Sequence, residues 1–277
     1  MKNIYKISFW NKHHDLVHGY STKRIGNLSF RSGHKESVEH GRIKMADELA
    51  INWEDVLFLP LSHSNNILSL SETSQLSKDA TGSYLDGGHI YVDSDVTVHN
   101  NQEWQKGIDG IVTNKKMIFP VIMSADCAAV ALYDSVKKVI GFVHVGLIGA
   151  VNRIIPKAVG CMINEYGSTC DDIEVVIFPS IRRCHYDLSK SGAWKNIQKD
   201  FVNYYGFENP FLVNDSFDLQ GMMFEQFAEL GLKKENIFDT DLCTVCNSDM
   251  FFSNLLAIDT EAKKREGRFA SIIGMKI

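Results

Sequence analysis

The sequence predicts a single α/β (α+β) domain, with a mixed β-sheet and helices packed outside it. Short apolar runs rich in β-branched residues recur along the chain, and four longer segments carry apolar residues at helical spacing. No repeat, low-complexity tract or Pro/Ser-rich linker divides the 277 residues. Because strand-like runs outnumber helical segments, a sheet covered by helices is the expected architecture. We therefore expect residues 1–277 to form one domain.

The expected strands are short, apolar and bounded by polar or turn-forming residues, as is typical of buried strands. They are Val56–Leu61, His89–Val98, Gly110–Thr113, Phe119–Met123, Ala128–Tyr133, Val139–Val145, Ile173–Ile177, Phe211–Val213, Met250–Leu256 and Phe269–Ile273.

The expected helices repeat apolar residues at spacings of three and four. They are Val38–Leu49, Leu147–Tyr166, Trp194–Tyr204 and Leu219–Leu230. The second of them contains Pro156. Proline lacks a backbone N–H and clashes with the preceding turn, so we expect this helix to be kinked or broken near Pro156.

Composition excludes several classes of function. Hydrophobic residues make up 44% of the chain and charged residues 23%, which is typical of a globular protein. The formal charge is -5 and no dense basic run is present, so nucleic acid is not an expected partner. The N-terminus lacks a signal-peptide core, and Met117–Tyr133 is short and interrupted by Asp126, so no membrane association is expected. We expect a cytoplasmic protein whose six cysteines are reduced thiols.

Asp126 and Cys127 stand at the seam between two strand-like runs, where polar groups need partners. A buried structural cysteine beside a carboxylate that caps a bend would explain an isolated pair of this kind. The next run, however, ends in His144, followed by Gly146 and then a helical pattern. Cys127 and His144 are therefore expected at the ends of neighbouring strands, where active sites are common.

His63 is a third candidate, because it follows an apolar run and precedes polar loop residues. Two imidazoles and one thiolate suit Zn²⁺, and three protein ligands leave a fourth position open for water or substrate. Structural zinc sites usually use close pairs of ligands, whereas these three residues are far apart in the chain. The residues predict one zinc ion in an enzyme active site.

Motifs along most of the chain resemble one known family. They are Tyr20–Ser29, Gly41–Arg42, His63, Asp109–Thr113, Ser124–Cys127, His144–Gly149, Pro179–Ile181, Tyr186–Leu188, Cys243–Thr244, Phe251–Ser253 and Gly267–Arg268. In this order and spacing they are similar to the laccase-domain or polyphenol-oxidase family, whose members are mostly regarded as zinc-dependent purine nucleoside enzymes.

The resemblance implies a single laccase-like domain with His63, Cys127 and His144 as zinc ligands. It also implies phosphorolysis of adenosine, inosine or methylthioadenosine, or deamination of adenosine, so that a purine nucleoside and phosphate are the expected small-molecule partners. Cys127 and Asp126 match the family's Ala-Asp-Cys motif and are therefore the expected catalytic residues. The expected substrate-binding residues are Arg24, Arg42 and Arg268, because these positions of the matching motifs are still arginine in this chain.

Several positions depart from the family's pattern. Leu61 replaces a glutamine, Phe178 replaces a glycine, and the usual Trp-Arg after His144 reads Leu147-Ile148. Leu255-Leu256 stands where the family has two arginines. The metal ligands are therefore kept while the polar residues around them are changed, and deamination is expected to be affected less than phosphorolysis.

Two other classes compete with this interpretation. In a metal-free cysteine hydrolase or deamidase, Cys127 would be the nucleophile and His144 its base, which leaves His63 without a role. A non-catalytic binding protein could keep the same fold. A multicopper oxidase needs more histidines than one His-Cys-His set supplies. The pair Cys243 and Cys246 precedes a strand-like run, and we interpret it as structural, with Cys184 as a loop residue.

Overall fold

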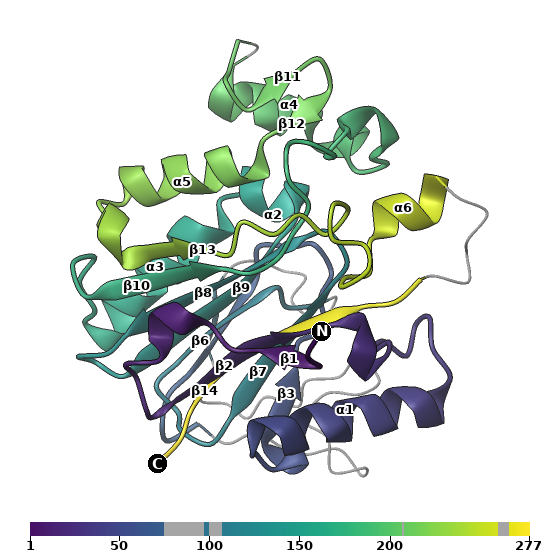
Figure 1. Ribbon diagram of the computed structural model, residues 1–277. Coiled ribbons are helices and arrows are strands. Elements are labelled where there is room, and N and C mark those ends of the chain that lie inside the picture. The colour runs from purple at the N-terminus through teal and green to yellow at the C-terminus, as the bar shows by residue number, and fades with distance from the viewer. Residues whose placement is uncertain (75–96, 100–106, 207, 260–265) are drawn as a thin grey trace.

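The computed structural model describes residues 1–74, 97–99, 107–206, 208–259 and 266–277. Two sheets stack face to face, and helices cover the outer side of each (Figure 1). The mixed α/β class predicted from the sequence is confirmed, although the strands divide between two main sheets. None of the helices in the described residues combines the length and apolarity that a membrane span requires.

The first sheet is mixed and has five strands. In spatial order they are β1 (Ile4–Tyr5), β2 (Leu16–Ser21), β14 (Phe269–Met275), β7 (Phe119–Ser124) and β3 (Val56–Phe58). The strand β14, close to the C-terminus, lies between β2 and β7, so the sheet joins both ends of the chain.

The second sheet has seven strands. In spatial order they are β13 (Ile237–Asp239), β10 (Ile173–Ile177), β8 (Ala128–Asp134), β9 (Val139–Val145), β6 (Gly110–Thr113), β4 (Ile67–Leu70) and β5 (Thr97–His99). A separate hairpin pairs β11 (Leu212–Val213) with β12 (Ser216–Phe217).

The helices lie outside the two sheets. They are α1 (Lys35–Leu49), α2 (Leu147–Val151), α3 (Ile154–Tyr166), α4 (Trp194–Tyr205), α5 (Leu219–Glu229) and α6 (Asn254–Asp259). Short 3-10 helices are η1 (Ser8–Trp10), η2 (Lys23–Ile25), η3 (Trp53–Asp55), η5 (Leu188–Lys190) and η6 (Lys234–Asn236).

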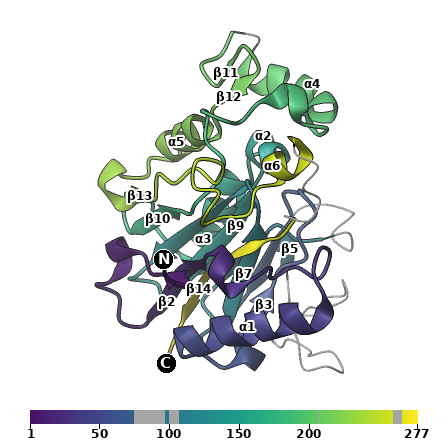
Figure 2. The same ribbon diagram turned by 45° about the vertical axis from the view of Figure 1, so that its right-hand side comes forward.

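Three apolar clusters hold these layers together. The central one fills the space between the sheets and contains Tyr133 and Phe142 from the second sheet and Ile122 from the first. Another packs α2, α3 and α5 on the second sheet, and the last packs α1 on the first sheet. Figure 2 shows α1 and α5 on opposite sides of the stacked strands. Burial on both faces explains why the central strands are almost wholly apolar.

Two predictions about elements need correction. The run Met250–Leu256 was expected to be a strand, but it is a turn followed by α6, because a short apolar run does not distinguish a strand from other buried segments. Phe251 in that turn is buried in the central cluster. The predicted strand His89–Val98 lies outside the described residues except for its last two positions, which belong to β5.

The predicted helix Leu147–Tyr166 is broken near Pro156, as expected, and the break lies at residues 152 and 153. Arg153 has a φ of 59°, in the left-handed region, and separates α2 from α3. Pro156 is the third residue of α3, where a backbone N–H has no partner within the helix. The break ends α2 at Val151, and α3 begins as a separate helix at Ile154.

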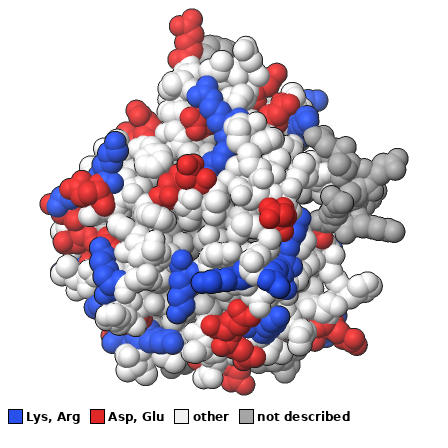
Figure 3. All heavy atoms as spheres, viewed as in Figure 1, with Lys and Arg blue, Asp and Glu red and all other residues white. Residues whose placement is uncertain are grey.

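Figure 3 shows Lys and Arg side chains in a row across the lower half of the face in view, with Asp and Glu side chains above and below them.

Candidate metal centre

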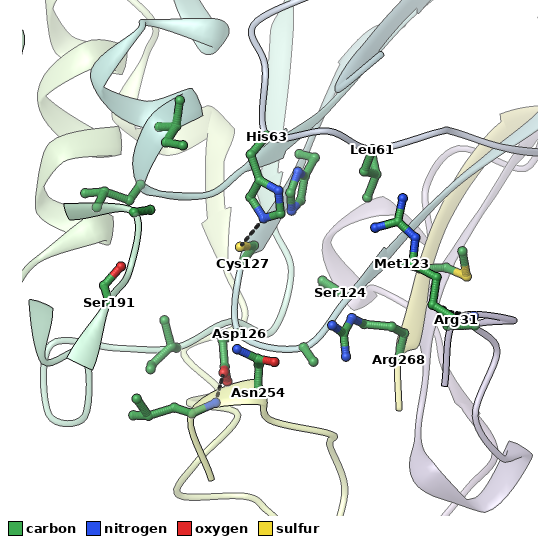
Figure 4. Close-up of a pocket in the computed structure, with 18 of the residues that line it drawn as sticks. Arg31, Leu61, His63, Met123, Ser124, Asp126, Cys127, Ser191, Asn254 and Arg268 are labelled. Atoms are coloured by element: carbon green, nitrogen blue, oxygen red, sulfur yellow. Dashed lines mark hydrogen bonds between the residues drawn. The ribbon is translucent and has the colours of Figure 1, made fainter. Parts of the chain in front are cut away.

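His63, Cys127 and His144 meet at one end of the stacked sheets. Each offers one ligand atom, and these atoms all lie within 4.8 Å of one another. The Sγ atom of Cys127 is 3.9 Å from Nε2 of His63, and the two imidazole rings have centroids 5.0 Å apart. Figure 4 shows His63 pointing at Cys127 inside the pocket. The structure thus brings together the three residues predicted from the sequence.

Strand pairing places two of these residues. Cys127 lies between β7 and β8, and His144 is near the end of β9. Because β8 and β9 are antiparallel and Ala129 pairs with His144, the start of β8 lies beside the end of β9. His63 comes from the loop that follows β3 in the first sheet, so the centre joins both sheets.

Asp109 organises the centre and is fully buried. Its Oδ1 atom lies 2.8 Å from Nδ1 of His144, and the same carboxylate accepts hydrogen bonds from the backbone N–H groups of Ser62, His63 and Ser64. An ionised carboxylate only accepts, so Nδ1 of His144 carries the proton and Nε2 is left as the ligand atom. The Asp109 carboxylate therefore orients His144 by a hydrogen bond to its imidazole ring, and His63 by a hydrogen bond to its backbone N–H.

Sequence reasoning did not assign a role to Asp109. The available signal was a single carboxylate directly before the apolar strand Gly110–Thr113, since a buried charge requires partners. Its partner Ser64 lies 45 residues earlier in the chain, and its partner His144 lies 35 residues later. No local pattern identifies them.

The backbone is unusual at two positions of the centre. His63 has a φ of 60° and Asp126 a φ of 102°, values that residues other than glycine rarely adopt. The carboxylate of Asp126 accepts a hydrogen bond from Thr244 Oγ1 at 2.7 Å and another from the N–H of Leu255 at 2.8 Å. Its carbonyl accepts from the N–H of Ile181 at 2.7 Å. These contacts hold the turn that presents Cys127.

The electrostatics of the centre favour the thiolate form of Cys127. Burial raises the pKa of this thiol, but the positive charge of His144 and hydrogen bonds from His144 and His63 lower it to about 6. Burial lowers the pKa of His144, whereas the Cys127 thiolate and the hydrogen bond to Asp109 raise it. A metal cation can take the place of the His144 proton as the charge that stabilises the thiolate.

The donor set and its surroundings fit a metal ion. One thiolate and two imidazoles converge from three separate segments, and the tautomer of one imidazole is fixed by a buried carboxylate. Gly146 leaves room at the centre, since a Cβ atom there would lie 3.0 Å from Cys127 Sγ and 3.3 Å from His63 Cδ2. His63, Cys127 and His144 are the residues that would hold the ion.

The centre opens into a pocket of about 500 Å³, a volume typical of small-molecule sites. Arg42 and Arg268 line it, as predicted from the sequence, and so does Arg31, which sequence reasoning missed. Arg42 is buried, donates to the carbonyl of Leu28 and stacks between Phe30 and Phe58. Arg31 and Arg268 lie together on one side of Cys127 in Figure 4.

Arg24 does not line this pocket, in contrast to the expectation. Its guanidinium donates to the carbonyl of Met1, because η2 turns the side chain towards the N-terminal segment. Ile148 and Leu255, two of the positions that depart from the family's pattern, do line the pocket. The change from arginine to apolar side chains at these positions therefore alters the pocket wall itself.

The chain is similar to several known proteins. A family model described as multi-copper polyphenol oxidoreductase laccase matches residues 17–276. The chain is 32% identical over 171 residues to the purine nucleoside phosphorylase LACC1 of Homo sapiens, a match that covers 57% of this chain and 39% of the human protein. It is 22% identical over 218 residues to adenosine deaminase RL5 from an unknown prokaryotic organism, covering 78% of this chain and 75% of that protein.

The fold is shared with solved structures. The crystal structure of YlmD from Geobacillus stearothermophilus superimposes with a TM-score of 0.75 at 18% identity, covering 100% of this chain and 97% of the other. At this identity the likeness concerns the fold alone. The laccase-like fold expected from the motifs is confirmed.

Proposed function

Because this chain belongs to the multi-copper polyphenol oxidoreductase laccase family, we propose that it is a zinc-dependent enzyme that acts on purine nucleosides, by phosphorolysis, deamination or both. The observation that carries this proposal is the convergence of His63, Cys127 and His144 at the floor of an open pocket. The names of two relatives, a purine nucleoside phosphorylase and an adenosine deaminase, support the substrate class.

Zinc is favoured over a multicopper centre by the ligands. Three donors serve a single ion, and a mixed thiolate and imidazole set that leaves one position open is typical of catalytic zinc. When bound there, zinc would supply Lewis acidity, polarising a substrate atom or lowering the pKa of a water molecule to about 7.

The chain's own residues divide the remaining work. Asp109 holds the Nδ1 proton of His144 and is a positioning residue. Both carboxylate oxygens of Asp126 accept hydrogen bonds from protein groups, so we assign it to positioning Cys127 and not to proton transfer. Arg31 and Arg268 are placed to attract an anion such as phosphate, since guanidinium groups form paired, charge-assisted hydrogen bonds with phosphate oxygens.

The test combines metal analysis with a substrate screen. Protein purified without added metal is assayed for zinc and for turnover of adenosine, inosine and methylthioadenosine, with and without phosphate. Cys127→Ala should lose the zinc of this centre and all turnover, because the thiolate is its only negatively charged donor. Cys170→Ala, which changes a half-buried thiol outside the centre, is the matched control and should lose neither.

One observation favours a second candidate, a metal-free cysteine hydrolase. The pKa of the Cys127 thiol is lowered to about 6 despite its burial, because the charge of His144 and hydrogen bonds from His144 and His63 outweigh that effect, and a reactive thiolate next to an imidazole is the arrangement of a cysteine nucleophile. This candidate requires activity that persists in the presence of a chelator and rapid alkylation of Cys127. Activity that disappears with the metal and returns with added zinc excludes it.

A further inference from the structure

A second group of metal-binding side chains lies outside the ligands of the first centre. Cys184 and His185 come from the loop after β10, and Cys243 and Cys246 come from the turn that precedes α6. Each offers one ligand atom, and the four atoms lie within 4.8 Å of one another. We propose that these residues form a structural zinc site with three cysteine ligands and one histidine ligand.

The distances between the donor atoms match a tetrahedron around zinc. With Zn–S bonds of about 2.3 Å and Zn–N bonds of about 2.0 to 2.1 Å, the edges of such a tetrahedron are about 3.8 Å between sulfurs and about 3.6 Å between sulfur and nitrogen. The Sγ atoms of Cys184 and Cys246 are 3.7 Å apart. Nδ1 of His185 lies 3.2 Å, 3.7 Å and 3.5 Å from the Sγ atoms of Cys184, Cys243 and Cys246.

The chain spacing and the backbone also suit a structural site. Two cysteines separated by two residues form a ligand pair that recurs in structural zinc sites, and here the pair lies in a turn. Burial raises the pKa of the Cys243 thiol, but the backbone N–H groups of Cys246, Arg182 and Val245 outweigh this effect and lower it. The turn therefore directs backbone N–H groups at the sulfur of Cys243.

Three cysteine sulfurs lie close together at this site, and a bound cation would reduce the repulsion between their thiolates. Burial, together with Cys243 and Cys246, raises the pKa of the Cys184 thiol to about 12, because neighbouring thiolates repel one another. The guanidinium of Arg182 is engaged by the carboxylate of Asp239. A divalent cation held by all four donors would supply the missing positive charge and deprotonate the coordinating thiols.

The site would fasten together two segments that reach the first centre. Ser180 and Cys243 form a β-bridge, and the N–H of Thr244 donates to the carbonyl of Ser180 at 3.1 Å. Thr244 and Ile181 are also the residues that donate to Asp126 beside Cys127. Zinc bound to Cys184, His185, Cys243 and Cys246 would thus stabilise the contacts that hold the Asp126 turn.

The experiment counts zinc ions in the full chain by native mass spectrometry and elemental analysis. The natural protein should bind two ions per chain. Cys184→Ser and Cys246→Ser should each lower the content by one ion, and Cys170→Ser should leave it unchanged. Cys127→Ala should remove the other ion, so that failure of the first centre and failure of this site are distinguished by which variant changes the count.

Rescue and spectroscopy guard against a variant that simply fails to fold. Cys246→His should keep the second ion, because two cysteines and two histidines also bind zinc. In cobalt-substituted protein, Cys127→Ala should retain most of the thiolate-to-cobalt absorption, and Cys246→Ser should lose most of it. Three results would overturn the proposal. The first is a zinc content that Cys184→Ser and Cys246→Ser leave unaffected, and the second is a Cys246→His variant with no more zinc than Cys246→Ser. The third is a Cys184–Cys246 disulfide in the isolated protein.

Discussion

Nδ1 of His144 lies 2.8 Å from Oδ1 of Asp109, and the two side chains are only 3% and 0% exposed. The same carboxylate accepts the backbone N–H of His63, so a single buried aspartate is linked to two of the three proposed ligands. Groups that orient a metal-bound histidine influence its affinity for the metal. This relationship leads to the first prediction.

Asp109→Asn should weaken zinc binding at the first centre by about 10- to 100-fold, the range found when such supporting carboxylates are changed. The amide keeps the shape but loses the charge, and its NH₂ group would face the N–H donors of Ser62 and Ser64. Competition with a chelator of known affinity measures the change. The matched control is Asp134→Asn, a buried aspartate that accepts from Val136 and Lys137 away from the centre. Equal losses in both variants would refute a specific role for Asp109.

Gly146→Ala should lower zinc affinity at the first centre by about tenfold, or about 1.4 kcal/mol. The added Cβ would lie 3.0 Å from Cys127 Sγ, so the ligand has to shift, and metal sites tolerate displacements of only about 0.5 Å. Gly146 has a φ of -90°, so the backbone itself accepts alanine. Gly160→Ala in α3, where no atom lies within 4 Å of the added Cβ, should leave zinc affinity unchanged. An unaltered affinity in Gly146→Ala would show that the centre has spare room.

His18 should make the protein less stable in mild acid. Burial, followed by the charge of Lys6, lowers its pKa to about 4, and its Nδ1 atom accepts from the N–H of Ile7 at 3.1 Å. Between pH 4 and pH 6.5 the unfolded chain binds the proton more readily than the folded chain, so stability falls as the pH falls through this window. From pH 7 to pH 5 the contribution amounts to about 2 kcal/mol.

The measurement is the free energy of unfolding in urea at both pH values. His18→Asn keeps a side-chain acceptor for Ile7 and does not titrate, so the loss between pH 7 and pH 5 should be smaller in this variant by about 2 kcal/mol. His14→Asn, at an exposed position for which no hydrogen bond or ion pair is described, is the control. A loss of the same size in the natural protein and in His18→Asn would rule out His18 as the source.

Local patterns predicted the long helices and most of the longer buried strands. The run Val139–Val145 and the helix over α5 follow from apolar periodicity alone, and the position of His144 at the end of its strand follows from the same run. The strand β2 was missed because His18 and Gly19 interrupt its apolar pattern. Both residues are nevertheless inside the fold, His18 with a backbone partner and Gly19 against the carbonyl of Tyr5.

The parts of the sites that sequence reasoning missed depend on contacts between distant segments. Asp109 becomes important only through Ser64 and His144, and Arg31 only because the loop before α1 borders the pocket. Cys184 and Cys246 were interpreted separately, 62 residues apart in sequence, although their Sγ atoms lie 3.7 Å apart. Neither segment holds four ligands by itself, so a search for ligand spacing within one segment does not find the group.

The last prediction concerns phosphate and rests on the proposed function. Any phosphorolysis by the natural protein should saturate only at high phosphate, and deamination should be less affected, because Ile148 and Leu255 in the pocket wall cannot donate hydrogen bonds through their side chains. Each charge-assisted hydrogen bond is worth about 1.5 to 3 kcal/mol. Ile148→Arg should therefore lower the KM for phosphate by about tenfold or more, at about 1.4 kcal/mol per factor of ten. The rates of adenine release and inosine formation from adenosine, each titrated with phosphate, measure both reactions.

Val136→Arg adds the same charge at an exposed turn between β8 and β9 and serves as the control, with an unchanged KM expected. The gain in Ile148→Arg should largely persist as salt is added, because charges in a partly enclosed pocket are screened less than charges in open solvent. Arg31 and Arg268 already line the pocket, and they offer a route by which the natural protein could bind phosphate without the residues it lacks. Fast phosphorolysis that saturates at low phosphate in the natural protein would contradict the prediction. Its loss in Arg31→Gln or Arg268→Gln would show that the two arginines proposed to attract phosphate are sufficient without Ile148 and Leu255 being arginine.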